Sequence, residues 1–549
     1  MEERIQKAVV EALKKMSAGN VSFVVERPSD MQFGDYATNA ALAASKALGK
    51  NPKELADELA RLLIDELGAT IASHITVAGP GFVNITLARE AVSFAIAEAD
   101  AKGEEWGKGT EENGKRIIVE YSNPNAFKEM HIGHLVGTVV GESVSRLIEN
   151  AGATLARDTF GGDIGPNVAK ALWGLRQKSI NEPTTAQEIG VAYAEGSNAY
   201  ESDPKAKEEI DELNQAIYAG ADRELMDLWR KGRAVSVEEF RRIWKLLGTH
   251  FDFEFFDSDT TDIGLRVVRD GLAKGIFQES DGAIIYNGEE KRVHTMVFIT
   301  SHHTPTYEAK DIGLAFLKEE RWPSDKVIIV TGNEQAGRFK TVLAAIADMN
   351  ASLAAKIIHL ATGFLKLASG KMSSREGNVI TASDFIIEVI DRASEKNADP
   401  LIAEQVAIGA IKYMILRQAP GSDIVFDPEK SLSLDGDSGP YLQYALVRAR
   451  KILTYTGGES GTDIPASPYT IERLILHFPE VVARAARELA PNLLVNYLTE
   501  LASEWNSFYA TEQVLGSSEE IYKQRVTRAF ANTMMNGLKL LGIPAPEKM

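Results

Sequence analysis

The sequence predicts an α/β domain built on a parallel sheet, with an α+β unit before it and an all-helical unit after it. Two apolar runs, Arg116–Tyr121 and Lys326–Val330, are each followed by a polar turn and then a helical pattern. This order is typical of the strand–helix units of a buried parallel sheet. From about Phe426 the alternation ends, and helical periodicity continues to Leu541.

Length and composition indicate a multidomain globular protein. The chain has 549 residues, of which 44% are hydrophobic and 25% charged, and it contains no cysteine. Disulfides and thiolate zinc sites are therefore excluded. A net charge of −18 argues against general nucleic-acid binding, so a nucleic acid would need local basic surfaces. No apolar run could span a bilayer and Met1–Lys7 lacks a signal peptide's apolar core, so we expect a cytoplasmic protein.

We place the domain boundaries where the pattern of elements changes. The prediction is an N-terminal α+β domain at 1–112, a catalytic α/β domain at 113–425, and a helical domain at 426–549. A polar, mainly helical insertion at about 165–280 interrupts the α/β domain, and the alternation resumes with strands at 281–286 and 295–299. In the first domain we expect helices Glu3–Met16 and Lys53–Leu67, and strands Val21–Val25 and Ile75–Val77.

The segment from Glu120 to His134 has the strongest local signal. A strand, a turn rich in Asn and Pro, and a helix follow one another, which puts His131 and His134 in the first helical turn. Free backbone N–H groups and the positive end of the helix dipole favour phosphate there. Gly133, Gly137 and Gly141 share one face and would admit a flat ligand or a neighbouring backbone. The alternative is a helix start whose histidines satisfy local carbonyls.

These residues resemble the first signature of class I aminoacyl-tRNA synthetases, His-Ile-Gly-His, at every position. The later segment Lys371-Met372-Ser373-Ser374 resembles the second signature, Lys-Met-Ser-Lys, at three positions of four. The preceding residues Ser122-Asn123-Pro124-Asn125 and Lys128 resemble those of the arginyl enzymes. Arginyl enzymes that lack the last lysine of the second signature use a lysine just before His-Ile-Gly-His instead. The resemblance implies a Rossmann-like catalytic domain in which Lys128 compensates for Ser374.

The same resemblance implies the ATP site. The expected catalytic residues are Lys128, His131, His134, Lys371 and Ser374, and the expected ATP-binding residues are His131, Gly133, His134, Lys371, Met372 and Ser373. ATP would be a substrate accompanied by Mg²⁺, and no zinc, organic cofactor or covalent enzyme intermediate is expected. Charge stabilisation and positioning dominate phosphoryl chemistry of this kind.

An arginine side chain needs carboxylates held opposite its N–H fork. Tyr307 and Asp311 are four residues apart, so a helix would present both on one face. By resemblance, Asp311 and Glu120 would contact the substrate's charges, and Asn125, Tyr307 and Gln335 would orient it. Without the surrounding match to the family, Asp311 would be interpreted as an exposed carboxylate on a helix.

The pair His302-His303 stands where the family usually has Asp-Gly. Adjacent residues of a strand point to opposite sides, and the sequence offers no third ligand. We therefore expect no metal at this pair.

The tRNA contacts are likewise implied by the resemblance. Phe82 and Asn84 would meet an unpaired base at the tRNA elbow, although a core phenylalanine and a turn-capping asparagine are equally good interpretations. Tyr441 and Arg448 lie in the segment similar to the anticodon-binding helices, where a tyrosine at helical spacing is more often core.

The function expected is that of an arginine–tRNA ligase: ATP activates L-arginine, and the arginyl group passes to the 3′-terminal ribose of tRNA(Arg), catalysed by a monomer without a membrane partner. Two alternatives stay open. A nucleotidylyltransferase or adenylate ligase of the same fold would not need the terminal domains. A silent tRNA-binding paralogue should have lost the histidines or lysines.

Overall fold

The computed structural model describes residues 1–368, 380–455 and 461–549. The chain forms two compact units. The larger unit contains Gly109–Tyr441, Ala485–Val495 and Leu538–Met549, and the smaller contains Met1–Lys108, Leu442–Arg484 and Asn496–Gly537. We describe each unit by itself.

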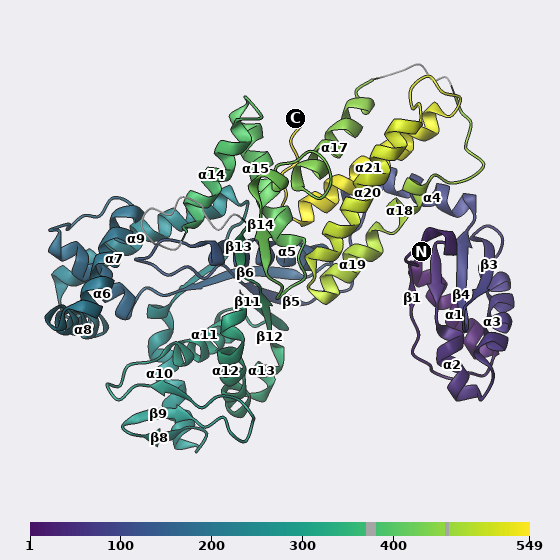
Figure 1. The fold of residues 1–549 in the computed structure, drawn as a ribbon. Helices are drawn as coiled ribbons and strands as arrows, with labels where there is room; N and C mark the ends of the chain where they lie inside the picture. The colour runs from purple at the N-terminus through teal and green to yellow at the C-terminus, as the bar shows by residue number, and fades with distance from the viewer. Residues whose placement is uncertain (369–379, 456–460) are drawn as a thin grey trace. The chain divides into compact units, whose positions relative to one another are not determined.

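A five-stranded parallel sheet forms the centre of the larger unit (Figure 1). Its strands, in spatial order, are β12 (Ile357–Thr362), β11 (Lys326–Gly332), β5 (Arg116–Glu120), β6 (Thr154–Gly161) and β7 (Phe253–Phe256). The sheet confirms the α/β fold class that the strand–helix alternation predicts. Ile117, Ile118 and Val119 are each at most 1% exposed, as a central strand covered on both faces requires.

The strand order creates a crevice beside β5. From β5 the chain continues through α5 (Ile132–Asn150) to β6 on one side, whereas β11 pairs with β5 on the other side. Ligands of such sheets bind outside the carboxyl ends of the strands where the order reverses. In this sheet that position lies between the ends of β5 and β11.

Helix α5 approaches the end of β5 closely because of Gly141. A Cβ placed on Gly141 would lie 2.3 Å from the Tyr121 side chain. Gly137 has more room, because a Cβ placed on it would meet only the Ser122 backbone nitrogen, at 4.0 Å. The glycine face predicted to admit a ligand or backbone therefore packs, at Gly141, against the protein's own aromatic ring.

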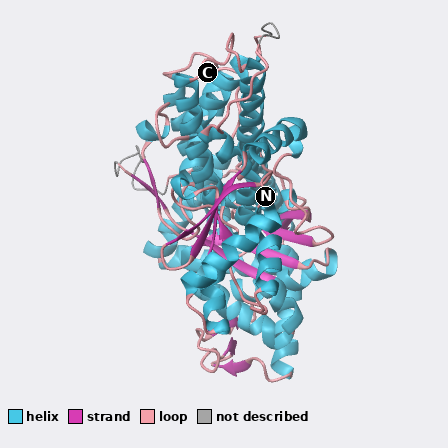
Figure 2. Cartoon of the chain, turned by 90° about the vertical axis from the view of Figure 1, so that its right-hand side faces the viewer, coloured by secondary structure: helices cyan, strands magenta, loops and turns pink. Residues whose placement is uncertain are grey.

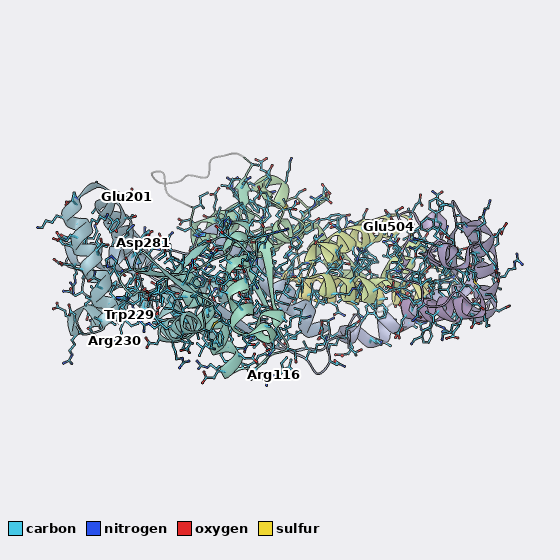
Figure 3. All side chains as sticks on the ribbon, turned by 90° about the horizontal axis from the view of Figure 1, so that it is seen from below. Arg116, Glu201, Trp229, Arg230, Asp281 and Glu504 are labelled. Carbon is cyan, nitrogen blue, oxygen red and sulfur yellow. The ribbon has the colours of Figure 1, made fainter. Side chains whose placement is uncertain are left out.

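Four helices interrupt the sheet and gather at one side of it (Figure 1). They are α6 (Pro166–Gln177), α7 (Ala186–Ser202), α8 (Pro204–Ala219) and α9 (Arg223–Leu246). On α9, the Trp229 indole donates to the Asp163 carbonyl at 2.7 Å, while its neighbour Arg230 is exposed (Figure 3). The helical run is shorter than the expected 165–280, because Phe253–Phe256 is already a strand of the central sheet.

The segments at 281–286 and 295–299 contain strands, as expected. The prediction that these strands continue the alternation of strands and helices in the parallel sheet is wrong. They pair in a separate antiparallel sheet ordered β10 (Met296–Ile299), β9 (Ala283–Tyr286) and β8 (Gln278–Ser280), apart from the parallel strands (Figure 2). Asp281 and Gly282 connect β8 to β9 with φ of 49° and 77°. An Asp-Gly pair with positive φ is the tight turn of a β-hairpin, which explains the antiparallel pairing.

The rest of the larger unit surrounds these sheets. Its remaining elements are α10 (Asp257–Ala273), α11 (Tyr307–Arg321), η3 (Asn333–Gln335), α12 (Ala336–Met349), α13 (Ala351–Lys356), β13 (Leu365–Leu367), α14 (Ala382–Ser394), α15 (Pro400–Leu416), β14 (Ile424–Phe426) and α16 (Pro428–Ser431). Strands β13 and β14 pair in parallel. An apolar core joins α10, α11 and α12 to the sheet through Val268, Ile312, Val342 and Ile329.

The smaller unit combines an α+β part with helices from the end of the chain. The first part contains α1 (Glu2–Lys15), β1 (Val25–Glu26), η1 (Met31–Phe33), β2 (Tyr36–Thr38), α2 (Ala40–Leu48), α3 (Pro52–Leu67), β3 (Ala72–Ala78), β4 (Phe82–Leu87), α4 (Arg89–Lys102) and η2 (Gly103–Glu105). Its strands form an antiparallel sheet ordered β1-β2-β4-β3. Of the expected strand Val21–Val25, only its last residue is in β1.

The C-terminal part is helical, as predicted. Its helices are α17 (Gly439–Leu453), α18 (Thr470–Leu476), α19 (Phe478–Glu488), α20 (Pro491–Thr511) and α21 (Glu520–Leu540). In the smaller unit the Trp106 indole donates to Thr533 at 3.1 Å, and Asn536 donates to the Gly103 carbonyl at 2.9 Å. In the part of the chain that the structure describes, no helix is long and apolar enough to cross a membrane.

A buried ionic network ties α5 to the sheet. The Glu142 carboxylate accepts hydrogen bonds from Tyr121 at 2.7 Å, Thr249 at 2.8 Å and Arg146 at 2.6 Å, and Arg157 lies 3.1 Å away. Burial alone would raise the pKa of Glu142, but the two guanidiniums hold it below its usual value. The carboxylate therefore stays charged. It balances the positive charge of Arg157, whose side chain is only 6% exposed.

We expect Glu142→Gln to lower the free energy of unfolding by about 3–5 kcal/mol, because it leaves the buried Arg157 without its main counterion. A carboxyl whose pKa is lowered by folding stabilises the protein above its unfolded pKa of about 4.3 and loses this effect as pH falls through the folded pKa. The difference in the free energy of unfolding between Glu142→Gln and the unmutated protein should thus be constant near neutral pH and should shrink below about pH 4.3. Denaturant titrations across pH check this. Glu149→Gln, at the exposed end of the Arg157 pair, should change little; equal losses for both variants would contradict the network.

Candidate active site at the ends of β5 and β11

The turn after β5 is fixed to the end of β6 by two asparagine side chains. Asn123 accepts from the Phe160 N–H at 3.0 Å, and Asn125 accepts from the Gly162 N–H at 3.0 Å. A Cβ on Gly161 would lie 2.3 Å from the Pro124 carbonyl, so the close approach requires glycine. Asn125, expected to orient a substrate, is thus seen to orient the turn itself.

The two histidines cap the helix that follows this turn. The Gly133 N–H donates to Nδ1 of His131 at 3.1 Å, and the His131 N–H donates to Nδ1 of His134 at 3.2 Å. Their rings stack with centroids 3.8 Å apart. Because each Nδ1 accepts, the proton of each neutral ring is on Nε2, which becomes a hydrogen-bond donor. Capping and phosphate binding are therefore compatible, since they use different ring nitrogens.

Lys128 acts electrostatically on both histidines. Burial lowers the pKa of His131, and the charge of Lys128 lowers it further. Burial, His131 and Lys128 together lower the pKa of His134 well below its usual value. The Lys128 ammonium lies 5.5 Å from the ring centroid of Tyr193, on α7. Among the described residues, the start of α5 thus presents two neutral imidazoles, on which the Lys128 cation acts.

The chain segment that follows 369–379 returns to this helix start. Residues His131 and Thr381 form an antiparallel bridge, the Ile132 N–H donates to the Ile380 carbonyl at 3.3 Å, and the Ala382 N–H donates to the Met130 carbonyl at 2.7 Å. The predicted site residues Lys371, Met372, Ser373 and Ser374 lie outside the described residues.

Asp311 lies at the start of α11 and pairs with a cation of this chain. The Arg338 guanidinium donates to Asp311 through Nη1 and to Gln335 through Nε, the latter at 2.9 Å. Burial raises the pKa of Asp311 to about 7, and the opposing charge of Arg338 limits that rise. One turn before Asp311, Tyr307 is 54% exposed. The structure thus brings Asp311 and Gln335 together around a guanidinium, with Tyr307 on the same helix.

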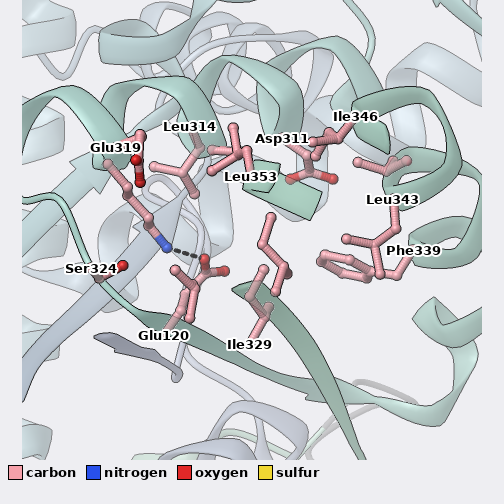
Figure 4. A pocket seen from close by; sticks show the side chains of 15 residues that line it. Glu120, Asp311, Leu314, Glu319, Ser324, Ile329, Phe339, Leu343, Ile346 and Leu353 are labelled. Atoms are coloured by element: carbon pink, nitrogen blue, oxygen red, sulfur yellow. Dashed lines mark hydrogen bonds and ion pairs between the residues drawn. The ribbon is translucent and has the colours of Figure 1, made fainter. Parts of the chain in front are cut away.

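Glu120, at the end of β5, is buried among polar and charged partners. It is 2% exposed, accepts from Asn123 at 3.0 Å, and forms an ion pair with Lys318, which also lies 2.5 Å from Asp158. Burial raises the pKa of Asp158 to about 7 despite the charge of Lys318. Figure 4 shows Glu120 and Asp311 at one narrow cavity of about 20 Å³, which is water-sized. This position favours a role for Glu120 in supporting the site.

A second buried ion pair, which the sequence pattern did not predict, lies beside Asp311. Lys310, between Tyr307 and Asp311, is 3% exposed and its ammonium lies 2.8 Å from the Asp257 carboxylate. It also lies 5.4 Å from the Tyr307 ring and 5.8 Å from the Tyr218 ring. Lys310 stands in the Thr306–Asp311 motif, but its partners come from α8 and α10, which no local pattern links to it.

The predicted tRNA contacts lie in different surroundings. Phe82 is 38% exposed at the start of β4, whereas Asn84 is 7% exposed within β4, where it pairs with neighbouring strands and caps no turn. Arg448 lies 4.5 Å from the Tyr444 ring and 5.1 Å from the Tyr509 ring, and it donates to Asn506 at 3.2 Å. Tyr441 is half-buried at the start of α17.

His302 and His303 do not lie on a strand, contrary to the expectation. Both are exposed in the turn between β10 and α11, and His303 has a φ of 62°. Among the described residues, no group of three or more His, Asp or Glu side chains is arranged to hold a metal ion.

Comparison with known families covers nearly the whole chain. Residues 96–428 match the family described as tRNA synthetases class I (R), catalytic domain. Residues 442–549 match the DALR anticodon binding domain, and residues 3–87 match the arginyl tRNA synthetase N terminal domain.

Individual proteins are similar over the same extent. A protein of Fusobacterium nucleatum named arginine–tRNA ligase is 30% identical, over 94% of each chain, and one of Treponema denticola with the same name is 29% identical, over 96% of this chain and 94% of its own. The arginyl-tRNA synthetase structure of Thermus thermophilus is 26% identical, covers 100% of both chains, and superposes with a TM-score of 0.83. The chain therefore belongs to the arginyl (R) branch of the class I tRNA synthetase family.

Proposed function

We propose that this protein is an arginine–tRNA ligase, which activates L-arginine with ATP and transfers the arginyl group to the 3′-terminal ribose of tRNA(Arg). The observation that carries the proposal is the match of residues 96–428 to the class I (R) catalytic domain, together with matches to an anticodon binding domain and to an arginyl N-terminal domain. An adenylate-forming enzyme of the same fold would need neither of the two flanking domains.

In the first step, an oxygen of the arginine carboxylate attacks the α-phosphorus of ATP. The bond from that phosphorus to the bridging oxygen breaks, and pyrophosphate leaves. We assign the stabilisation of the phosphate oxygens at the N-terminus of α5 to the Nε2–H groups of His131 and His134 and to the ammonium of Lys128, and the use of both Nδ1 atoms as cap acceptors supports this assignment. Gly133 leaves the helix start open, and Lys371, Met372 and Ser373 are assigned to ATP by resemblance. Mg²⁺ would accompany ATP.

In the second step, a hydroxyl of the terminal ribose attacks the arginyl carbonyl, and AMP leaves with the bonding electrons of the C–O bond. Positioning dominates this step, because no covalent enzyme intermediate forms. We assign the arginine side chain to Asp311, with Tyr307 and Gln335 as its orienting partners, and the nucleic acid to Phe82, Tyr441 and Arg448. A cytoplasmic, monomeric enzyme remains a prediction.

The function is tested with purified protein, labelled arginine, ATP with Mg²⁺ and total tRNA. Labelled tRNA should form only when all components are present, and should not form when lysine replaces arginine, because lysine lacks the planar N–H fork. Adenylate transfer to another acceptor in the absence of tRNA would instead indicate a nucleotidylyltransferase. Binding of tRNA without any charging would indicate a silent paralogue.

Lys128→Ala should reduce the rate of arginine activation by about 10²–10³-fold, the effect of removing one preorganised charge from a transition state. Pyrophosphate exchange measured with tRNA present checks the rate, and filter binding should show nearly unchanged tRNA affinity. Adding Ser374→Lys should restore part of the activity. Lys170→Ala is the matched control, because Lys170 also lies over a tyrosine ring, Tyr200, at 4.6 Å. Wild-type turnover in Lys128→Ala would disprove the compensation.

Asp311→Asn preserves the shape of the carboxylate and removes its charge. Loss of a charge-assisted pair in a desolvated pocket should cost about 2–5 kcal/mol of arginine recognition. The KM for arginine should rise steeply while the KM for ATP barely moves. Glu320→Gln, at an exposed carboxylate of the same helix, should change neither constant. Equal increases in both constants for Asp311→Asn would mean that the residue supports the fold and not the pocket.

A further inference from the structure

The carboxylate proposed to bind the substrate's guanidinium already holds one. Arg338, on α12, donates from Nη1 to Asp311 and from Nε to Gln335, the latter at 2.9 Å. These are two of the groups that we assign to the arginine side chain. A substrate guanidinium and Arg338 present the same planar fork of N–H donors, so they would compete for the same acceptors.

Arg338 is held less firmly than Lys318, the cation that lines the cavity beside Asp311. Its side chain is 22% exposed, whereas that of Lys318 is 4% exposed and lies between two carboxylates, those of Glu120 and Asp158. Arg338 has one carboxylate partner among the described residues, and its stem starts from the first turn of α12. Arg338 can therefore leave toward solvent, while Lys318 cannot move without uncovering two buried charges.

Charge balance explains why a cation belongs there in the absence of substrate. The charges of Glu120 and Glu308 both raise the pKa of Asp311, so they lie close enough to make its ionisation more costly. A buried carboxylate without a cation would take up a proton and lose its affinity for guanidinium. Exchange of one guanidinium for another keeps the net charge constant, so the carboxylate stays ionised before and after binding.

We propose that Arg338 is an internal substitute for the substrate's side chain: it occupies Asp311 and Gln335 in the free enzyme, and L-arginine must displace it to bind. This inference rests on the proposed function, because it takes Asp311 as the substrate's partner. As a consequence, a ligand enters only if its cation binds Asp311 more tightly than Arg338 does. The apparent affinity for arginine is then reduced by the fraction of molecules in which Arg338 has left.

The test is Arg338→Met, which keeps an unbranched side chain and removes the guanidinium. Binding of L-arginine should become about 5- to 100-fold tighter, the usual range of coupling between competing interactions. The KM for ATP should not change. Lys340→Met, at an exposed lysine two residues further along α12, is the matched control and should leave both constants unchanged. Calorimetry measures arginine binding at several pH values above 8, because the loss of Arg338 removes the charge that limits the rise in the pKa of Asp311.

A second measurement needs neither tRNA nor activity. Free guanidinium chloride at low millimolar concentration should raise the melting temperature of Arg338→Met relative to sodium chloride at the same ionic strength, but not that of the unmutated protein. The double variant Asp311→Asn/Arg338→Met should lose this response. Should Arg338→Met fold poorly, Arg338→Gln, which can still bond to Gln335, replaces it with the same expectation.

Each result decides the matter. Weaker or unchanged arginine binding in folded Arg338 variants, or a guanidinium response that survives the Asp311→Asn change, would overturn the proposal and make Arg338 a fixed part of the pocket. Failure of the unmutated protein to charge tRNA with arginine would instead overturn the proposed function, which the melting experiment leaves untouched.

Discussion

The start of α5 depends on the reciprocal hydrogen bonds between two histidine rings and the backbone that carries them. Each Nδ1 accepts a backbone N–H, which satisfies donors that a helix start otherwise leaves free and fixes both ring orientations. The Nε2–H groups are then the donors that remain for a ligand. Met130 and Ile132, on either side of the cap, bond to Ala382 and Ile380. One local arrangement therefore positions the first signature and the chain that follows the second.

The histidines are effective as neutral donors because of their surroundings. Burial disfavours an imidazolium at both positions, and Lys128 adds like-charge repulsion. Among the described residues at this helix start, the positive charge thereby comes from Lys128 and from the helix terminus. This arrangement also explains why a chain with a net charge of −18 can bind a polyanionic substrate: the positive potential is local.

Around Asp311 the crevice follows a different principle, the pairing of buried carboxylates with cations of the chain itself. Glu120 and Asp158 share Lys318, Asp257 has Lys310, and Asp311 has Arg338. A buried carboxylate is costly when unpaired, so each of these pairs stabilises the empty site. Of the three cations, Arg338 has the chemistry of the substrate and the most exposed side chain. In the displacement that we propose, the specificity of the pocket and the pairing of Asp311 in the free enzyme are thus linked through Arg338.

The sequence by itself determined the elements whose signals are local. The strand Arg116–Glu120, the helix that His131 caps, the strand at 326 and the helices after 438 all follow from periodicity, β-branching and capping residues in neighbouring positions. The two class I signatures were recognisable for the same reason, since each is a short run of consecutive residues.

Only the tertiary structure decided how distant segments pair. Phe253–Phe256 could have been part of the helical insertion until its pairing with β6 placed it in the sheet, and the Asp281-Gly282 turn directed two strands into a separate sheet. Glu120 and Lys318 are 198 residues apart, and Asp311 and Arg338 lie on different helices, so no spacing rule connects them. Ion pairing in a buried crevice depends on which side chains the fold brings within a few ångströms, and that information exists only once the chain is packed.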